Sequence, residues 1–143
     1  MTKIDFYILS SKKAPKHDLF ACKLSEKIYK GGHRLFINTN NEQQSQQIDK
    51  LLWTFRESSF VPHSISTSAQ EPSDPVQLAH DLEPDQQQQH EVLLNLADEV
   101  PSFFSQFPRV AEIVSQEDVQ KKHARERFKF YRDRGYKIDT HTL

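Results

Sequence analysis

The 143-residue chain has a net charge of −1 and is 36% hydrophobic and 27% charged, which fits a globular protein able to bury a core. It has no apolar run near the ~20 residues that a membrane-spanning helix needs, and residues 1–6 lack the pattern of a signal peptide. Cys22 is the only cysteine, so no disulfide can form within the chain. We therefore expect a cytoplasmic protein.

The first third of the chain alternates between strand and helix patterns. The predicted elements are a strand at 4–9, a helix at 17–30, a strand at 35–37 and a helix from capping residues 39–42 to about residue 53. Gly31-Gly32 is a strong helix stop, and Asp18 suits an N-cap or the first turn of the first helix. Such alternation is typical of a parallel sheet covered by helices.

The later signals are weaker. Residues 60–65 are expected to lead into a short strand, and strands are predicted at 76–79, 92–96 and 110–114. Helical turns are predicted at 102–107, and a last helix at 116–134 that Gly135 ends. Ser115 begins a capping-box pattern and is the expected N-cap of this helix. The polar stretches 66–75 and 85–90 are expected to be surface loops, too short to divide the chain. We expect one α/β domain over residues 1–143, with a mostly parallel central sheet flanked by helices, Rossmann-like but without a phosphate-binding loop.

The sequence gives little sign of catalytic, cofactor or metal chemistry. Gly31-Gly32 precedes a strand instead of following one, so it cannot form a strand-to-helix phosphate cradle. The seven histidines are scattered without metal-binding spacing, and Cys22 lies in an amphipathic helix pattern. Asp5 lies near the start of its strand, whereas catalytic groups in open α/β sheets lie at the carboxyl ends. We expect no catalytic residue, no cofactor and no metal.

Positive charge is concentrated in the last predicted helix. Residues 121–134 contain seven Lys or Arg and two acids, a net charge of +5, so the rest of the chain carries −6. At ~100° per residue, four cations fall within an arc of ~80°, with Phe128 about 20° beyond one edge. These four are Lys121, Arg125, Lys129 and Arg132. A local field of this kind attracts acidic partners.

Two interpretations of this helix face remain open. It is either a solvated basic surface or a binding face on which arginine clamps carboxylates beside an exposed Phe128 ring. The side that faces the core is also open, because Ala124 and Tyr131 form one apolar side and Val119, His123 and Phe130 another. Arg127 falls between these sides. If it is buried, it needs a carboxylate partner, which the sequence does not identify.

An aromatic cluster surrounds the end of the second predicted helix. Residues 51–55 (Leu-Leu-Trp-Thr-Phe) are followed by 60–63 (Phe-Val-Pro-His). The cluster is either the end of a helix packed on the sheet or an exposed patch for a protein partner, since Trp and Phe are enriched at binding hot spots.

Several of these segments resemble the chi subunit family of bacterial DNA polymerase III. Residues 124–132 (Ala-Arg-Glu-Arg-Phe-Lys-Phe-Tyr-Arg), with Gly135 and Thr140 after them, resemble the family's C-terminal signature. Leu52-Trp53 and residues 59–63 resemble its central signature. Residues 6–9 and the Gly-x-Arg-Leu of residues 32–35 also match, so the resemblance spans nearly the whole chain.

The resemblance implies an accessory subunit of the replicative polymerase complex. Members of the family have an α/β fold similar to nucleotide-binding domains, but without catalysis or a nucleotide. They bind the acidic C-terminal tail of single-stranded DNA-binding protein, which ends in Ile-Pro-Phe with a free carboxylate. They also pair with the psi subunit, which ties them to the clamp loader. Contact with single-stranded DNA would then be indirect, with no membrane and no small-molecule substrate.

By position, the resemblance implies a site for each partner. The residues expected at the acidic tail are Lys121, Arg125, Phe128, Lys129 and Arg132, with Val114, Phe60 and Thr140 shaping the pocket. Trp53 and Phe55 are candidates for the psi-facing surface. Phe128 stands where other members can carry Tyr, so any role of that hydroxyl is absent here. The Gln-rich segment 85–90 departs from the family pattern.

Two other functions compete with the adaptor. The first is direct binding of single-stranded nucleic acid by the same basic helix, with a steep dependence on salt. The second is a Rossmann-like enzyme, which requires a pocket with converging polar groups at the carboxyl ends of the strands.

Overall fold

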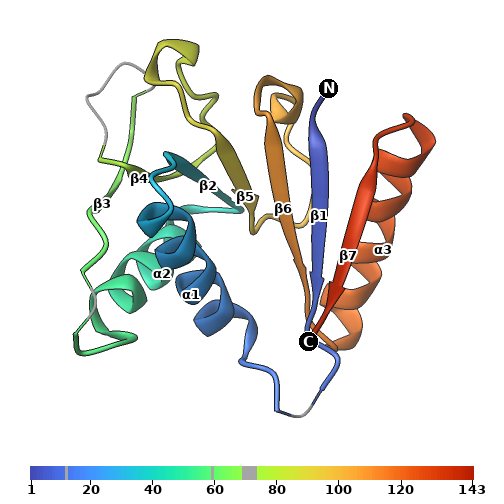
Figure 1. The fold of residues 1–143 in the computed structure, drawn as a ribbon, viewed down its shortest axis with the longest axis horizontal. Coiled ribbons are helices and arrows are strands. Elements are labelled where there is room, and N and C mark those ends of the chain that lie inside the picture. The colour runs from blue at the N-terminus through green and yellow to red at the C-terminus, as the bar shows by residue number, and fades with distance from the viewer. Residues whose placement is uncertain (12, 59, 69–73) are drawn as a thin grey trace.

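Seven parallel strands form one sheet in the computed structural model, which describes residues 1–11, 13–58, 60–68 and 74–143. The strands are β1 (Lys3–Ile8), β2 (Leu35–Thr39), β3 (His63–Ile65), β4 (Val76–His80), β5 (Val92–Asn95), β6 (Arg109–Val114) and β7 (Ile138–Thr142). Their order is β3-β4-β2-β5-β6-β1-β7, and every pairing is parallel (Figure 1). The predicted α/β class with a mostly parallel sheet is confirmed.

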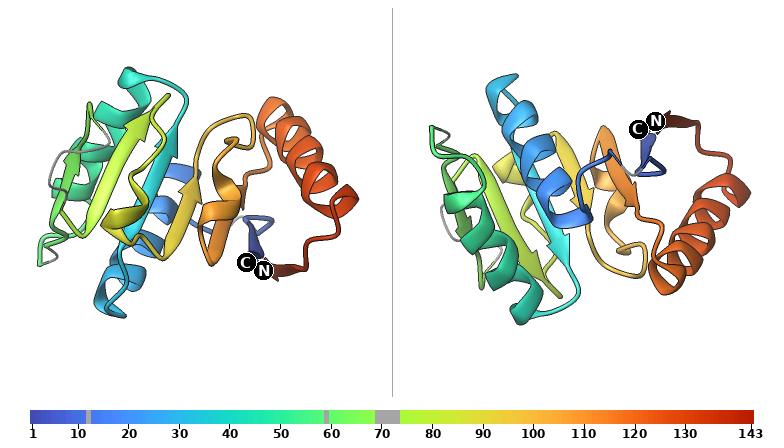
Figure 2. Two further views of the ribbon diagram at one scale, coloured as in Figure 1. Left: turned by 90° about the horizontal axis from the view of Figure 1, so that it is seen from above. Right: turned by 90° about the horizontal axis from the view of Figure 1, so that it is seen from below.

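Three helices cover the two faces of this sheet (Figures 1 and 2). They are α1 (His17–Lys30), α2 (Glu42–Thr54) and α3 (Asp118–Asp133), with short 3-10 helices η1 (Gln86–Gln88) and η2 (Phe104–Gln106). Neighbouring residues of β2 belong to different cores: Ile37 packs in the core under α1 and α2, and Phe36 in the core under α3. Because side chains alternate along a strand, α3 lies on the face opposite to α1 and α2.

The helix boundaries follow from local chemistry. Helix α1 has its predicted bounds, and Gly32 adopts φ 84° in the turn that ends it, a conformation that favours glycine. Asn41 caps α2 by accepting a hydrogen bond from the Gln44 backbone N–H at 2.8 Å. The predicted capping box of α3 is wrong. The helix begins later, and the Ser115 hydroxyl donates to Gln120 Oε1 at 2.5 Å instead of capping the backbone.

The weaker predictions had mixed outcomes in the structure. Residues 60–65 lead into a short strand as expected, which is β3, and η1 forms within the expected loop 85–90. Of the expected loop 66–75, residues 69–73 lie outside the described residues. Strand β7 was not predicted, because Ile-Asp-Thr-His-Thr lacks an apolar alternation, and it pairs with β1 alone. Among the described helices, none is long and apolar enough to cross a membrane.

Candidate functional site

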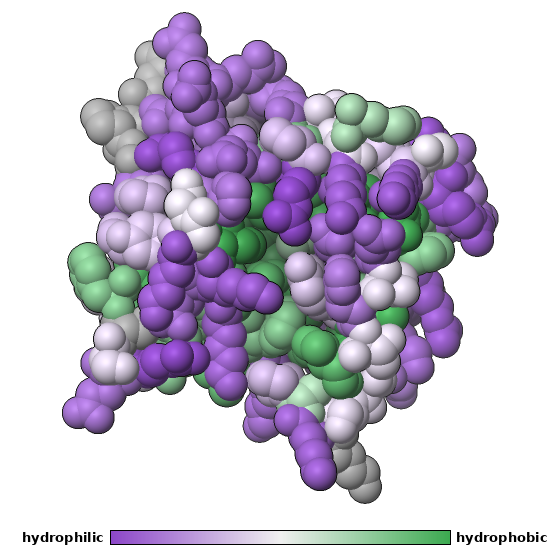
Figure 3. All heavy atoms as spheres, in the orientation of Figure 1, coloured by the Kyte–Doolittle hydropathy of each residue, from purple (hydrophilic) through white to green (hydrophobic). Residues whose placement is uncertain are grey.

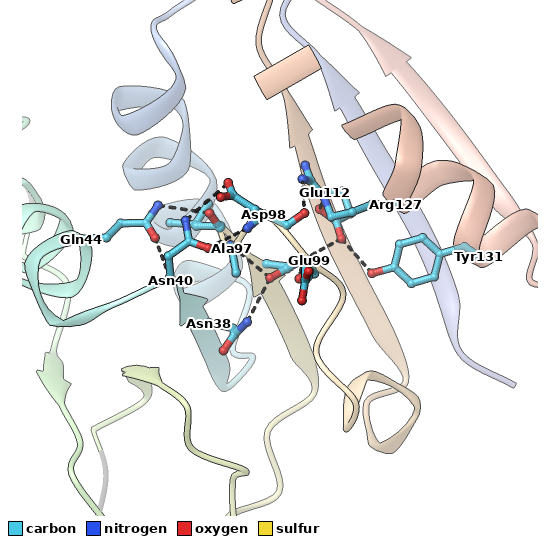
Figure 4. Close-up of polar contacts among 11 residues, drawn as sticks. Asn38, Asn40, Gln44, Ala97, Asp98, Glu99, Glu112, Arg127 and Tyr131 are labelled. Atoms are coloured by element: carbon cyan, nitrogen blue, oxygen red, sulfur yellow. Dashed lines mark hydrogen bonds and ion pairs between the residues drawn. The ribbon is translucent and has the colours of Figure 1, made fainter. Parts of the chain in front are cut away.

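A buried ion pair fixes α3 on the sheet (Figure 4). Arg127 Nε donates to Glu112 Oε1 at 2.8 Å, and the side chains are only 8% and 0% exposed. Glu112 Oε2 accepts from the Tyr131 hydroxyl at 2.7 Å and from Asn95 Nδ2 at 3.0 Å. Burial raises the pKa of Glu112 above its ordinary value, while Arg127 and both hydrogen bonds oppose this rise. Glu112 is thus the carboxylate partner of Arg127 that the sequence left unidentified.

The same network continues into the loop after β5. Arg127 Nη1 donates to the Asp98 carbonyl at 3.0 Å, and the Asp98 N–H donates to Asn40 Oδ1 at 2.8 Å. The helix therefore has one fixed rotation, with Ala124, Arg127 and Tyr131 buried. A signal for this pair was present in the sequence: Glu112 interrupts an apolar run, and an acid in a buried strand needs a cationic partner.

This rotation turns the four predicted cations away from the core. Arg125, Lys129 and Arg132 are exposed, and Lys121 is partly exposed. Arg132 contacts the exposed carboxylate of its neighbour Asp133 at 3.3 Å. Among the described residues, Lys121, Arg125 and Lys129 have no ion pair within 4 Å. We call Lys121, Arg125, Lys129 and Arg132 the basic arc.

The expected exposure of Phe128 is wrong. Its ring is half-buried beside the core and contacts Phe6 edge-on, with the ring centroids 5.2 Å apart. The helix position explains this result, because Phe128 lies between the buried Ala124–Tyr131 side and the basic arc. The ring thus packs on Phe6, and helical periodicity places Phe128 next to the basic arc.

Two further predicted pocket residues lie on the same face of the sheet as α3. Val114, at the end of β6, packs with the core that contains Phe128. Thr140 in β7 is paired with Phe6 of β1, and paired residues of parallel strands point to the same face. Since the Phe6 ring contacts Phe128, the structure brings Val114, Phe128 and Thr140 to one region beside the basic arc.

Phe60 lies elsewhere, at the opposite edge of the sheet. It is 63% exposed, and its ring centroid is 5.8 Å from that of Trp53, which is 54% exposed. Both lie beside β3, the edge strand furthest from β7 in the strand order. Figure 3 shows hydrophobic atoms at the surface on this side of the molecule. We call Trp53 and Phe60 the aromatic edge.

His63 packs against the aromatic edge, whereas Phe55 packs on the core. The buried His63 ring lies 4.6 Å from the Trp53 ring and contacts the Val61 carbonyl through Nδ1 and the Asp49 carbonyl through Nε2. Phe55 is half-buried against the core under α1 and α2. Of the two predicted residues, Trp53 therefore offers much more surface than Phe55.

A polar cavity of about 790 Å³ opens at the carboxyl ends of β2, β4 and β5. Its titratable side chains are Asp81, Glu83, Asp98, Glu99, His123 and Glu126. The end of the sheet where an enzyme of this fold class would bind its ligand is therefore not filled by apolar residues. The excess of carboxylates makes the cavity unfavourable for phosphate groups. Within the described residues, no cluster of three or more His, Cys, Asp or Glu could hold a metal.

Comparison with known proteins gives a consistent result over the whole chain. The family model described as DNA polymerase III chi subunit, HolC, matches residues 1–139. The DNA polymerase III subunit chi of Pseudomonas aeruginosa is 36% identical over 143 residues, covering 100% of this chain and 98% of that protein. The subunit chi of Haemophilus influenzae is 31% identical over 96% of this chain and 95% of its own length. The subunit chi of Escherichia coli is 30% identical over 85% of this chain and 82% of its own length.

A solved structure extends the comparison of folds. The crystal structure of T4 UvsW matches with a TM-score of 0.67 and 9% identity, over 99% of this chain and 41% of that chain. At this identity the likeness shows a shared α/β fold and nothing of function.

Proposed function

Since the chain belongs to the DNA polymerase III chi subunit family, and is thus an accessory subunit in DNA replication, we propose that it is an adaptor with two partners. The basic arc binds the acidic C-terminal tail of single-stranded DNA-binding protein. The aromatic edge binds the psi subunit, which connects the chain to the clamp loader. In this role the chain acts as one domain over residues 1–143 and uses no catalytic residue or cofactor of its own.

The observation that carries this proposal is the basic arc on a rigidly held helix. Lys121, Arg125 and Lys129 are not neutralised by acids of the described chain, so their charges are available to a partner. The Arg127–Glu112 pair holds α3 in one rotation, so these cations do not have to be ordered when a ligand binds. Arg125 can clamp a carboxylate with two hydrogen bonds.

The surroundings of Phe128 suit the apolar end of the tail. A peptide that ends in Ile-Pro-Phe offers a hydrophobic side chain and a free carboxylate close together. Phe128, Val114 and Thr140 provide a partly apolar surface directly beside the cations. The ring of the peptide would contact this surface while its carboxylate meets Arg125 or Lys129.

The aromatic edge suits a different partner, because it has no cationic arc. Trp53 and Phe60 are exposed side by side, an arrangement that water disfavours and a protein partner would cover. The two surfaces lie at opposite edges of the sheet, beside β7 and beside β3. Both partners can therefore bind at the same time.

The test is fluorescence anisotropy of a labelled acidic peptide ending in Ile-Pro-Phe. Arg125→Ala should weaken binding by at least about 1.5 kcal/mol, or roughly tenfold, if Arg125 makes a charged hydrogen bond. Lys50→Ala is the matched control, because Lys50 is an exposed cation on α2. Equal affinity of the wild type and the Arg125→Ala variant would exclude the basic arc as the peptide site.

A further inference from the structure

A second basic surface lies on α1. Residues 12–34 contain seven Lys or Arg and two acids, a net charge of +5, so the part of the chain outside this segment and residues 121–134 carries −11. Lys23, Lys27 and Lys30 are the exposed residues of α1, and the N-cap Lys16 is also exposed. In Figure 3, hydrophilic side chains extend over the position of α1. We call Lys16, Lys23, Lys27 and Lys30 the lysine ridge.

The lysines of the ridge form a line along the helix. At ~100° per residue they fall within an arc of about 60°, and at ~1.5 Å per residue they extend over about 21 Å. Lys30 is 3.8 Å from Glu26, which also contacts Arg56 at 3.4 Å. In the part of the chain that the structure describes, Lys16, Lys23 and Lys27 have no ion pair within 4 Å. The ridge is thus an extended row of largely unneutralised charge.

Aromatic rings lie next to this row. Phe20 is four residues after Lys16 and three before Lys23, so it lies on the same side of α1. The Phe20 ring is half-buried, with its centroid 5.5 Å from that of Tyr7 in β1. Tyr7 in turn stacks on the exposed His141 ring of β7, with centroids 4.8 Å apart and planes 20° apart. A hydrogen bond of 3.0 Å joins His141 Nε2 to Asp5 Oδ1.

From this arrangement we propose that the lysine ridge and the row of Phe20, Tyr7 and His141 bind a single strand of nucleic acid. A row of exposed lysine ammonium groups suits the repeating phosphates of a nucleic-acid backbone, and aromatic rings suit unstacked bases. This contact is direct, and it is separate from the tail-binding basic arc on the opposite face of the sheet.

Two other anionic partners, a membrane surface and an acidic peptide, fit the ridge less well. A helix that binds a membrane inserts its apolar face, but the apolar side of α1 (Ala21, Cys22 and Leu24) is buried in the core. An acidic peptide with a terminal carboxylate favours arginine forks, and the ridge consists of lysine alone. The aromatic row further favours a ligand with stacking bases.

The test is anisotropy of a labelled oligothymidylate at low salt. Each lysine that neutralises a phosphate adds about 0.7 to the slope of log affinity against log salt, so three or four lysines give a slope of about −2 to −3. Lys23→Glu/Lys27→Glu should weaken binding at least about tenfold and reduce the slope by about 1.4. His141→Ala should weaken binding about fivefold through loss of one stacked base.

The controls separate this surface from the others. Lys50→Glu, a charge reversal on the neighbouring α2, should leave oligothymidylate binding nearly unchanged. The Lys23→Glu/Lys27→Glu variant should keep its affinity for the Ile-Pro-Phe peptide, and thermal unfolding should show that it is folded. Three results would overturn the proposal. The first is no oligothymidylate binding at low salt, and the second is binding that is lost in Arg125→Glu but retained in Lys23→Glu/Lys27→Glu. The third is that Lys23→Glu/Lys27→Glu loses binding to anionic lipid vesicles to the same extent as binding to oligothymidylate.

Discussion

Replacing Arg127 by methionine removes one partner of the buried pair and keeps a side chain of similar length. Glu112 is then left in the core with two hydrogen-bond donors, Tyr131 and Asn95, and without a cation. Breaking a buried pair in this way lowers the free energy of unfolding by about 3–5 kcal/mol. Because two donors to Glu112 remain, we expect a loss of about 3 kcal/mol. At about 3 °C per kcal/mol for a chain of this size, the melting temperature should fall by about 10 °C.

The loss should depend on pH in a defined direction. Burial already raises the pKa of Glu112 above its ordinary value, and removal of Arg127 raises it further. The folded variant then binds a proton that the unfolded chain releases, so its stability falls as pH rises from the ordinary pKa of Glu through the raised one. The deficit relative to the wild type should therefore be larger at neutral pH than in mild acid.

Urea unfolding of Arg127→Met and wild type at two pH values measures this deficit. Arg125→Met is the matched control, because the same exchange at an exposed position should change stability by no more than about 0.5 kcal/mol. Adding Glu112→Gln to Arg127→Met should recover at least about 1 kcal/mol, since a neutral side chain no longer needs a cation. The reasoning is refuted if Arg127→Met loses less than about 1 kcal/mol, or if its deficit is the same at both pH values.

Three further predictions concern the caps, the thiol and the aromatic edge. Asn41→Ala should cost about 1 kcal/mol in urea unfolding by removing the α2 cap, and Asn41→Asp should keep most of that stability. Burial raises the pKa of Cys22 to about 12, so a thiol reagent at neutral pH should label it only as fast as the chain opens. The double variant Trp53→Ala/Phe60→Ala should weaken psi binding by at least about 2 kcal/mol in calorimetry and leave the affinity for the acidic peptide unchanged. An unchanged affinity for psi would remove the aromatic edge from the proposal.

The elements that the sequence predicted well depend on short-range chemistry. Helix α1 was bounded correctly because Gly31-Gly32 ends it, and Asn41 was among the residues expected to cap α2. The capping box at Ser115 failed because an equally local alternative, the contact with Gln120, competed with it. Strand β7 was missed because its stability comes from backbone pairing with β1, which leaves no pattern in its side chains.

The candidate site was predictable in part for the same reason. Helical periodicity alone placed Lys121, Arg125, Lys129 and Arg132 on one side of the last helix, since the period is local. The burial of Phe128 and the partner of Arg127 depend on which side of α3 meets the sheet, and this is decided by Glu112 in β6 and Phe6 in β1. The separation of Phe60 from the basic arc follows from the strand order, which the periodicity of single segments does not encode.

The most direct test of the adaptor is to map the bound peptide by NMR. Backbone amide shifts of the labelled chain are recorded while an acidic peptide ending in Ile-Pro-Phe is added. The proposal predicts that the largest changes fall on residues 121–132 of α3, on Val114 and on Thr140, with little change at Trp53 and Phe60. Changes centred on Trp53 and Phe60, or no change at saturating peptide, would contradict it.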